Sequence, residues 1–306
     1  MPPQDSPVPP DALESDISIQ GKRILGPTGQ FGTTKNSGMF NFGQTSIAEF
    51  VQANPGAFPG VSQSLLRIMR AVSENEGKLE AVNSYDNAFM SFGIFQWTAG
   101  AEGDRGELAD FLDLLKRSRP AVFQTYFGTH GLDIKIGAPT QSALRTGFLV
   151  LNGQVLNTAT RKKVLRTPIW GYRFWRAGHD TGVRACEIEQ AIARIDVFYK
   201  TPRTALQGKS VADFVSSEFG VALLLDQHVN RPGHVPKTLV KAIAAFTAAT
   251  GKTNPATWTS AEERSVLARY LVERASTSMT NSDKRAQSVR DAVDAGQLSE
   301  VRGSFQ

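Results

Sequence analysis

Glu76 is the residue of this sequence whose position best suits acid–base chemistry. Four apolar residues before it recur at i, i+3, i+4 and i+7, a spacing that predicts one buried stripe along a helix. Glu76 continues that stripe, whereas Glu74 points away from it. A carboxyl group against apolar surroundings holds its proton to higher pH, as the general acid of a glycosidase must. The stripe consists of Leu65, Ile68, Met69 and Val72.

Two interpretations of Glu76 compete. Gly77 is of the type that often ends a helix, so Glu76 is either the buried acid just described or an exposed residue at a frayed helix end. If the helix ends early, Glu74 becomes the alternative acid.

A polar turn over residues 83–87 follows and contains two further candidates. Asp86 either acts as a second carboxylate, which would activate water or attack the sugar, or only caps the turn with its side chain. Tyr85 either stacks on a sugar ring or packs against its neighbours. The residue types alone leave both pairs of alternatives open.

The run from Ser91 to Trp97 is typical of a short strand. Strand alternation places Gln96 on one face with Phe92 and Ile94. Its amide could hydrogen-bond an N-acetyl or hydroxyl group of a glycan, or could simply end a buried strand.

These two runs together resemble a known active-site signature. The run from Ala71 to Gly77, a spacer and the run from Ser91 to Gln96 are similar to the signature of the lysozyme-like superfamily, in particular of soluble lytic transglycosylases and goose-type lysozymes. The resemblance covers roughly residues 60–100. In that family a helix ends on a catalytic Glu, usually followed by Ser, and a Gly-aliphatic-Met-Gln strand lines the saccharide groove. The matching positions are Glu76, Gly93 and Gln96, and the departures are Gly77, Phe95 and the Trp97-Thr98 ending.

The resemblance implies a site and a reaction. The general acid is Glu76, with Asp86 as second carboxylate unless the enzyme is a lytic transglycosylase, which needs none. The substrate is the glycan strand of peptidoglycan, cleaved by a muramidase or a lytic transglycosylase, and we expect neither cofactor nor metal. The expected substrate-binding residues are Tyr85, Ser91, Phe92, Gln96 and Trp97.

Two other functions remain open. Inverting chitosanases share the broad fold, so chitosan or chitin is an alternative substrate. A non-catalytic lysozyme-fold protein, such as a structural or binding component of a tail, is a different class. Scattered basic residues argue against nucleic acid as a partner, although residues 161–163 form a small basic patch.

Composition sets further bounds. The 306 residues include 34 basic and 29 acidic side chains, a net charge of +5 that suits an anionic partner, and a single cysteine, Cys186. We expect no signal peptide and no membrane span, hence secretion or injection by another route and action in the periplasm or cell wall. A secretion or phage-tail carrier and an immunity protein are the partners that such a delivery predicts.

The predicted fold is mostly α, a lysozyme-like helical fold with a small β-hairpin and additional C-terminal helices. Residues 1–20 read as a disordered Pro-rich lead, and residues 21–306 as the catalytic domain with a sub-boundary near 200–210. The aromatic run from Trp170 to Trp175 is interpreted as a core helix, and Asp226 to His234 as a helix-end turn rather than a metal site. Helices are expected at about 46–58, before and up to Glu76, and at about 103–119, 183–200, 209–229, 236–249, 260–277 and 282–295.

Overall fold

The computed structural model describes residues 16–54, 56–58, 61–138 and 145–306. Their contacts divide them into two compact units. The first covers residues up to 45 together with 77–138 and 145–190, and the second covers 46–76 and 191–306. Residues 1–15 of the predicted Pro-rich lead lie outside the described residues, and its last three form a strand.

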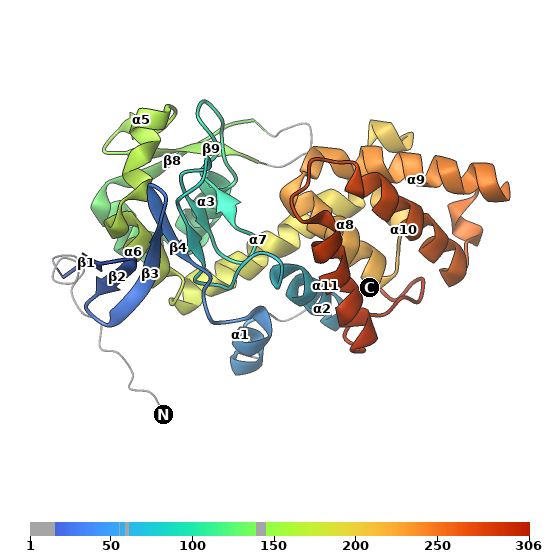
Figure 1. Cartoon of the computed structure of the whole chain (residues 1–306), viewed down its shortest axis with the longest axis horizontal. Coiled ribbons are helices and arrows are strands. Elements are labelled where there is room, and N and C mark those ends of the chain that lie inside the picture. The colour runs from blue at the N-terminus through green and yellow to red at the C-terminus, as the bar shows by residue number, and fades with distance from the viewer. Residues whose placement is uncertain (1–15, 55, 59–60, 139–144) are drawn as a thin grey trace. The chain divides into compact units, whose positions relative to one another are not determined.

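An antiparallel sheet organises the first unit (Figure 1). Its seven strands, counted over the described residues, are hydrogen-bonded in chain order, so each pairs with the strand next to it in sequence. They are β1 (Ser18–Gln20), β2 (Arg23–Gly26), β3 (Gly29–Lys35), β4 (Gly38–Asn41), β5 (Val82–Asn83), β6 (Ser91–Phe92) and β7 (Trp97–Thr98).

The sheet is therefore larger than the small β-hairpin predicted from the sequence, and the protein is mixed α/β. Residues 18–41 form successive hairpins, in which tight turns connect neighbouring antiparallel strands. Asn36, with φ 49°, occupies the left-handed backbone region that the β3–β4 turn requires. Phe31 and Met39 are buried, which fixes the register of these strands on the core.

Helices and a second sheet complete the first unit. The sheet has the order β10-β9-β8, and α6 packs against β4 and β5. Its core is aromatic: Trp97 stacks on Phe111 at 5.0 Å, and Phe92 lies between Phe111 and Phe174. The elements are α3 (Leu108–Ser118), α4 (Pro120–Tyr126), β8 (Leu132–Ile136), β9 (Gly147–Leu151), β10 (Gln154–Val155), α5 (Ala159–Lys162), α6 (Pro168–Ala177) and α7 (Thr181–Lys200), which continues into the second unit.

The second unit is helical in its described residues. Its central helix, α8, is buried along most of its length and contacts α2, α9, α10 and α11. Short 3-10 helices connect the longer ones at Thr204–Leu206, Val211–Asp213, Pro232–His234 and Pro255–Thr257. The helices are α1 (Ile47–Ala53), α2 (Gln63–Ser73), α8 (Glu218–Asn230), α9 (Val235–Thr250), α10 (Ser260–Ala275) and α11 (Ser282–Asp294).

Most predicted helices are confirmed, with shifted ends. The segment 209–229 is the exception, since its first part forms a 3-10 turn and α8 begins only at Glu218, where Ser217 caps it. Trp170, Tyr172 and Phe174 are buried in α6, which confirms the interpretation as a core helix. No helix in the described part of the chain is long and apolar enough to cross a membrane.

Candidate active site

Glu76 lies in a turn after α2, since the helix ends at Ser73 and not at Glu76 as the sequence predicted. The side chain of Ser62 caps the start of this helix by accepting the Leu65 N–H at 3.1 Å. At the other end the ladder tightens to i→i−3 bonds, in which the Glu76 N–H donates to the Ser73 carbonyl at 3.1 Å. The helix proper ends at Ser73, and the tightened turn brings Glu76 round to the side of α2 that faces α8 and α11.

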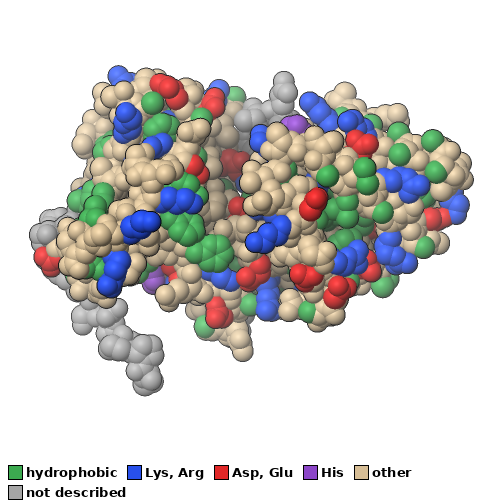
Figure 2. Space-filling model, viewed as in Figure 1, with side chains coloured by type: hydrophobic (Ala, Val, Ile, Leu, Met, Phe, Trp, Pro, Cys, Tyr) green, Lys and Arg blue, Asp and Glu red, His purple; other side chains and the backbone are tan. Residues whose placement is uncertain are grey.

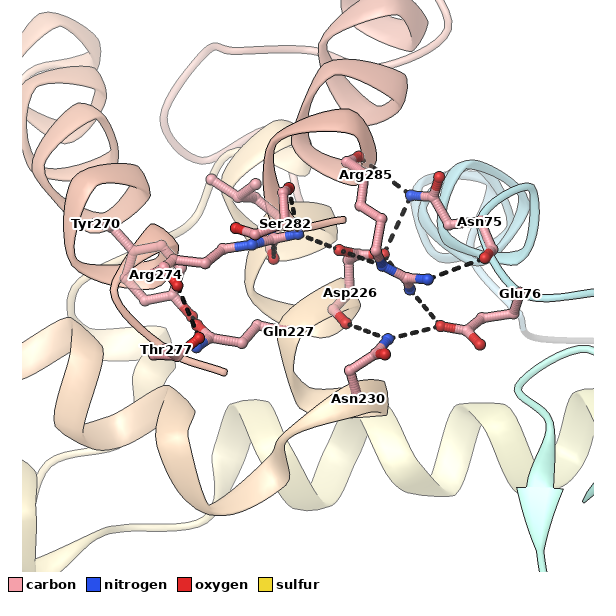
Figure 3. Close-up of polar contacts among 11 residues, drawn as sticks. Asn75, Glu76, Asp226, Gln227, Asn230, Tyr270, Arg274, Thr277, Ser282 and Arg285 are labelled. Carbon is pink, nitrogen blue, oxygen red and sulfur yellow. Dashed lines mark hydrogen bonds and ion pairs between the residues drawn. The ribbon is translucent and has the colours of Figure 1, made fainter. Parts of the chain in front are cut away.

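The Glu76 carboxylate is held by two later helices of the same unit (Figure 3). Its Oε1 accepts a hydrogen bond from Asn230 Nδ2 at 2.8 Å and a shorter one, with an ion pair, from Arg285 Nη2. The side chain is 11% exposed, so it is partly accessible although firmly bound. Glu74, two residues earlier, is exposed, which favours Glu76 over the alternative acid.

Arg285 is itself fixed by Asp226 of α8. Its Nη2 lies 2.7 Å from Asp226 Oδ1, and its Nη1 donates to the Asn75 carbonyl at 2.9 Å. The Asn75 amide donates back to Asp226 Oδ1 and to the Arg285 carbonyl, each at 3.1 Å. These reciprocal bonds fix the guanidinium plane and therefore the position of the Glu76 carboxylate.

A second arginine, Arg274, completes the cluster on the other side of Asp226 from Arg285. Arg274 of α10 binds Asp226 Oδ2 through Nη2, and both side chains are 0% exposed. Its Nη1 also donates to the Leu223 carbonyl at 3.0 Å. The two carboxylates of Glu76 and Asp226 thus face two guanidinium groups, and the cluster is neutral when all four are ionised.

The electrostatics of Glu76 combine opposing effects. Burial raises the pKa of Glu76 above its ordinary value, the positive charge of Arg285 opposes this rise, and the negative charge of Asp226 adds to it. Hydrogen bonds from Arg285 and Asn230 also stabilise the ionised form. Because the net direction is upward, Glu76 retains its proton to higher pH than a free glutamic acid.

Arg285 remains positively charged at the pH values over which Glu76 titrates. Burial works against its charge, but the neighbouring carboxylates of Glu76 and Asp226 raise its pKa above the ordinary arginine value. Since both hydrogen bonds to Glu76 end on Oε1, a proton on the neutral acid belongs on Oε2, which points away from Arg285 in Figure 3. A buried acid with one oxygen anchored and the other protonated is suited to proton donation.

Asp86 and Tyr85 lie in the first unit. The Asp86 carboxylate accepts the Ala88 N–H and the Asn83 side-chain amide, both at 2.9 Å, so it caps its own turn. Tyr85 is half-buried, with the Lys35 ammonium 3.9 Å above its ring. Both side chains have partners within the first unit, and their expected catalytic and substrate-binding roles stay predictions.

The strand predicted over 91–97 is wrong in form. It is a hairpin, β6–β7, with a turn between Phe92 and Trp97 because Gly93 and Gln96 adopt left-handed φ values of 76° and 47°. Gln96 therefore does not share a strand face with Phe92 and Ile94, and its amide donates to the Gly93 carbonyl at 3.0 Å. Ser91, Phe92 and Trp97 are buried in the first unit, and their expected substrate-binding role stays a prediction.

The sequence did not predict the partners of Glu76. Asp226, Asn230 and Arg285 lie 150 or more residues from it, and only the tertiary fold brings them together. One signal was present: Asp226 directly follows the apolar run Val221 to Leu225, and an acid there requires a cation. The structure supplies Arg274 and Arg285, and in the described residues no group of His, Cys, Asp and Glu is arranged to hold a metal ion.

Charge is mixed over the face shown in Figure 2, where Lys and Arg side chains are interspersed with Asp and Glu.

No family model, curated protein or solved structure matches the chain.

Proposed function

We propose that the protein is a glycosidase that cleaves the glycan strand of peptidoglycan, with Glu76 as the general acid. The observation that carries the proposal is the state of Glu76: a partly accessible carboxyl group, held through one oxygen and with a pKa raised by burial. The resemblance of residues 60–100 to lysozyme-like active sites supplies the substrate class.

In this proposal Glu76 begins the reaction as the neutral acid. Oε2 donates its proton to the glycosidic oxygen as the bond to the anomeric carbon breaks. The carboxylate so formed is stabilised by Arg285 and Asn230 on Oε1, because both already point at that atom. Asp226 supports the acid through Arg285 and does not meet the substrate, since it is fully buried.

The second half of the reaction needs no second carboxylate. Asp86 is engaged in capping its turn, so we assign it no catalytic role. The Glu76 carboxylate can take a proton from the sugar's own hydroxyl, as in a lytic transglycosylase, or from water, as in a muramidase. Mass analysis of digested sacculi separates these routes, because anhydro and reducing ends differ by one water.

Replacement of Glu76 by Gln tests the proposal. We expect Glu76→Gln to lower the clearing of purified sacculi by about 10²- to 10⁴-fold, the usual contribution of a general acid. Glu74→Gln, on the exposed side of the same turn, is the matched control and should retain activity. Full activity of Glu76→Gln in a folded protein would contradict the assignment, and turnover of chitosan oligomers instead of sacculi would change the substrate.

A non-catalytic role is the second candidate, because an ion pair with Arg285 would also be expected of a purely structural Glu76. Sacculus binding by the unmodified protein without release of soluble fragments, together with loss of thermal stability in Glu76→Gln, would favour it. The delivery route and an immunity protein stay predictions from the sequence.

A further inference from the structure

A cavity in the helical unit contains a buried histidine that the proposed reaction does not use. The cavity has a volume of about 460 Å³, within the range of small-molecule sites, and all its lining residues belong to the second unit. They come from α7, α8, the 3-10 turns before α8 and after it, and the first turn of α9.

His228 on α8 is the unusual group in this cavity. It is only 2% exposed, and within the described residues neither ring nitrogen has a hydrogen-bond partner. Burial and the positive charges of Arg194 and Arg203 hold its pKa well below the ordinary value, so the ring is neutral near pH 7. A neutral imidazole has one N–H donor, and leaving it unused in a buried site is costly.

The first turn of α9 faces the same cavity. This helix has 16 residues and starts at Val235, its N-cap residue His234 makes no side-chain capping bond, and Pro236 in its first turn has no N–H to donate. The start of a helix of this length attracts anions through its dipole and through the N–H groups of its non-proline residues. His228 supplies a second donor there, from a different helix and independently of the first.

Charge and shape at the cavity agree with these donors. Arg203 and Lys237 are the two cationic side chains in its lining, and no carboxylate takes part in it. Lys237, the third residue of α9, is exposed. The remaining walls are largely apolar and include Phe198, whose ring lies 5.2 Å from the His228 ring.

We propose that this cavity binds an organic anion, a small molecule whose carboxylate or phosphate group meets the start of α9 and the His228 ring while its apolar body lies against Phe198. The site is separate from the Glu76 cluster and independent of the proposed function. The charged group accepts hydrogen bonds from His228 and the first turn of α9, and Arg203 and Lys237 balance its charge.

Benzoate and its neutral isostere benzamide test the proposal directly. Saturable binding of benzoate to the full chain is measured by calorimetry and by the ring signals of ¹⁵N-histidine, with benzamide titrated in parallel and phenyl phosphate as a second anion. We expect a shift of the His228 signal with benzoate or phenyl phosphate and at least about tenfold weaker binding of benzamide. Equal affinity for benzamide, or no saturable binding of either anion, would overturn the proposal.

Two variants assign the site. His228→Phe keeps an aromatic ring against Phe198 but removes the donor, and we expect at least about tenfold weaker benzoate binding. Lys237 is exposed, so Lys237→Gln should not disturb folding, and we expect it to weaken benzoate binding several-fold. Lys241→Gln, one turn further along α9 and outside the cavity lining, is the matched control. Benzoate affinity equal to that of the unmodified protein in Lys237→Gln and His228→Phe would refute the assignment.

Discussion

Replacement of Arg285 by Met removes the cation that lies against the Glu76 carboxylate. The ion pair is 11–12% exposed, so solvent screens it only in part. Unit charges about 4 Å apart at an effective dielectric constant of about 20 interact by about 4 kcal/mol, which corresponds to about 3 pKa units. Water entering the vacated space and the remaining bond from Asn230 reduce this effect, and we expect the pKa of Glu76 to rise by about 1–2 units.

The direction of the change follows from the charge alone. Arg285 favours the ionised form of Glu76, so its loss favours the protonated form and raises the pKa. If the protonated form is the active one, the alkaline limb of the pH profile of kcat/KM on sacculi should move to higher pH by the same amount. The ¹³C signal of the Glu76 carboxyl group gives the pKa without reference to activity.

Lys284→Met is the matched control, because it removes the same charge from the adjacent, exposed position of α11. It should leave both the titration and the profile unchanged. Arg285→Lys should lie between the unmodified protein and Arg285→Met, since it keeps the charge but loses the forked geometry. An unchanged or lowered Glu76 pKa in a folded Arg285→Met protein would refute the electrostatic account.

Two further predictions concern buried charges. Asp226→Asn leaves the fully buried Arg274 without its counter-charge, so the free energy of unfolding in urea should fall by about 3–5 kcal/mol. Asp283→Asn, on the exposed face of α11, is the control and should change this free energy little, and equal stabilities of the two variants would refute the proposed pairing. Burial raises the pKa of Glu187 well above 4.5, so the folded protein holds a proton that the unfolded chain releases, and stability should decline by up to about 1.4 kcal/mol per pH unit above that value. Glu187→Gln still accepts the Ile94 N–H and should be more stable than the unmodified protein at pH 7. Glu189→Gln is the contrast and should bring no such gain, because the Glu189 carboxylate binds Arg119. If the stability of Glu187→Gln still declines with rising pH, another group is responsible for the decline.

The sequence predicted the features that depend on local pattern. The apolar stripe of α2 and the aromatic core helix were predicted correctly because apolar spacing determines which helix face is buried. The β-hairpins before residue 42 were missed because their strands are short and rich in glycine, and paired neighbours decide such strands more than propensity does. Gln96 was misplaced because a two-residue alternation was applied across a turn.

The partners of Glu76 could not be predicted in the same way. No local pattern connects it with Asn230 or Arg285, and only the packing of α2 on α8 and α11 brings the three together. Asp226 was noticed as the end of an apolar helix, but its role depends on two arginines that follow it by 48 and 59 residues.

The separation of these residues along the chain has a consequence for biosynthesis. Asn230 and Arg285 follow Glu76 by 154 and 209 residues, so a ribosome must release α11 before the anchored acid can exist. Until then Glu76 lacks the contacts with Asn230 and Arg285 that hold its carboxylate. If Glu76 is the general acid proposed above, the chain is inactive until these contacts form, and the wide separation of the contacting residues in sequence makes this part of the fold slow to form.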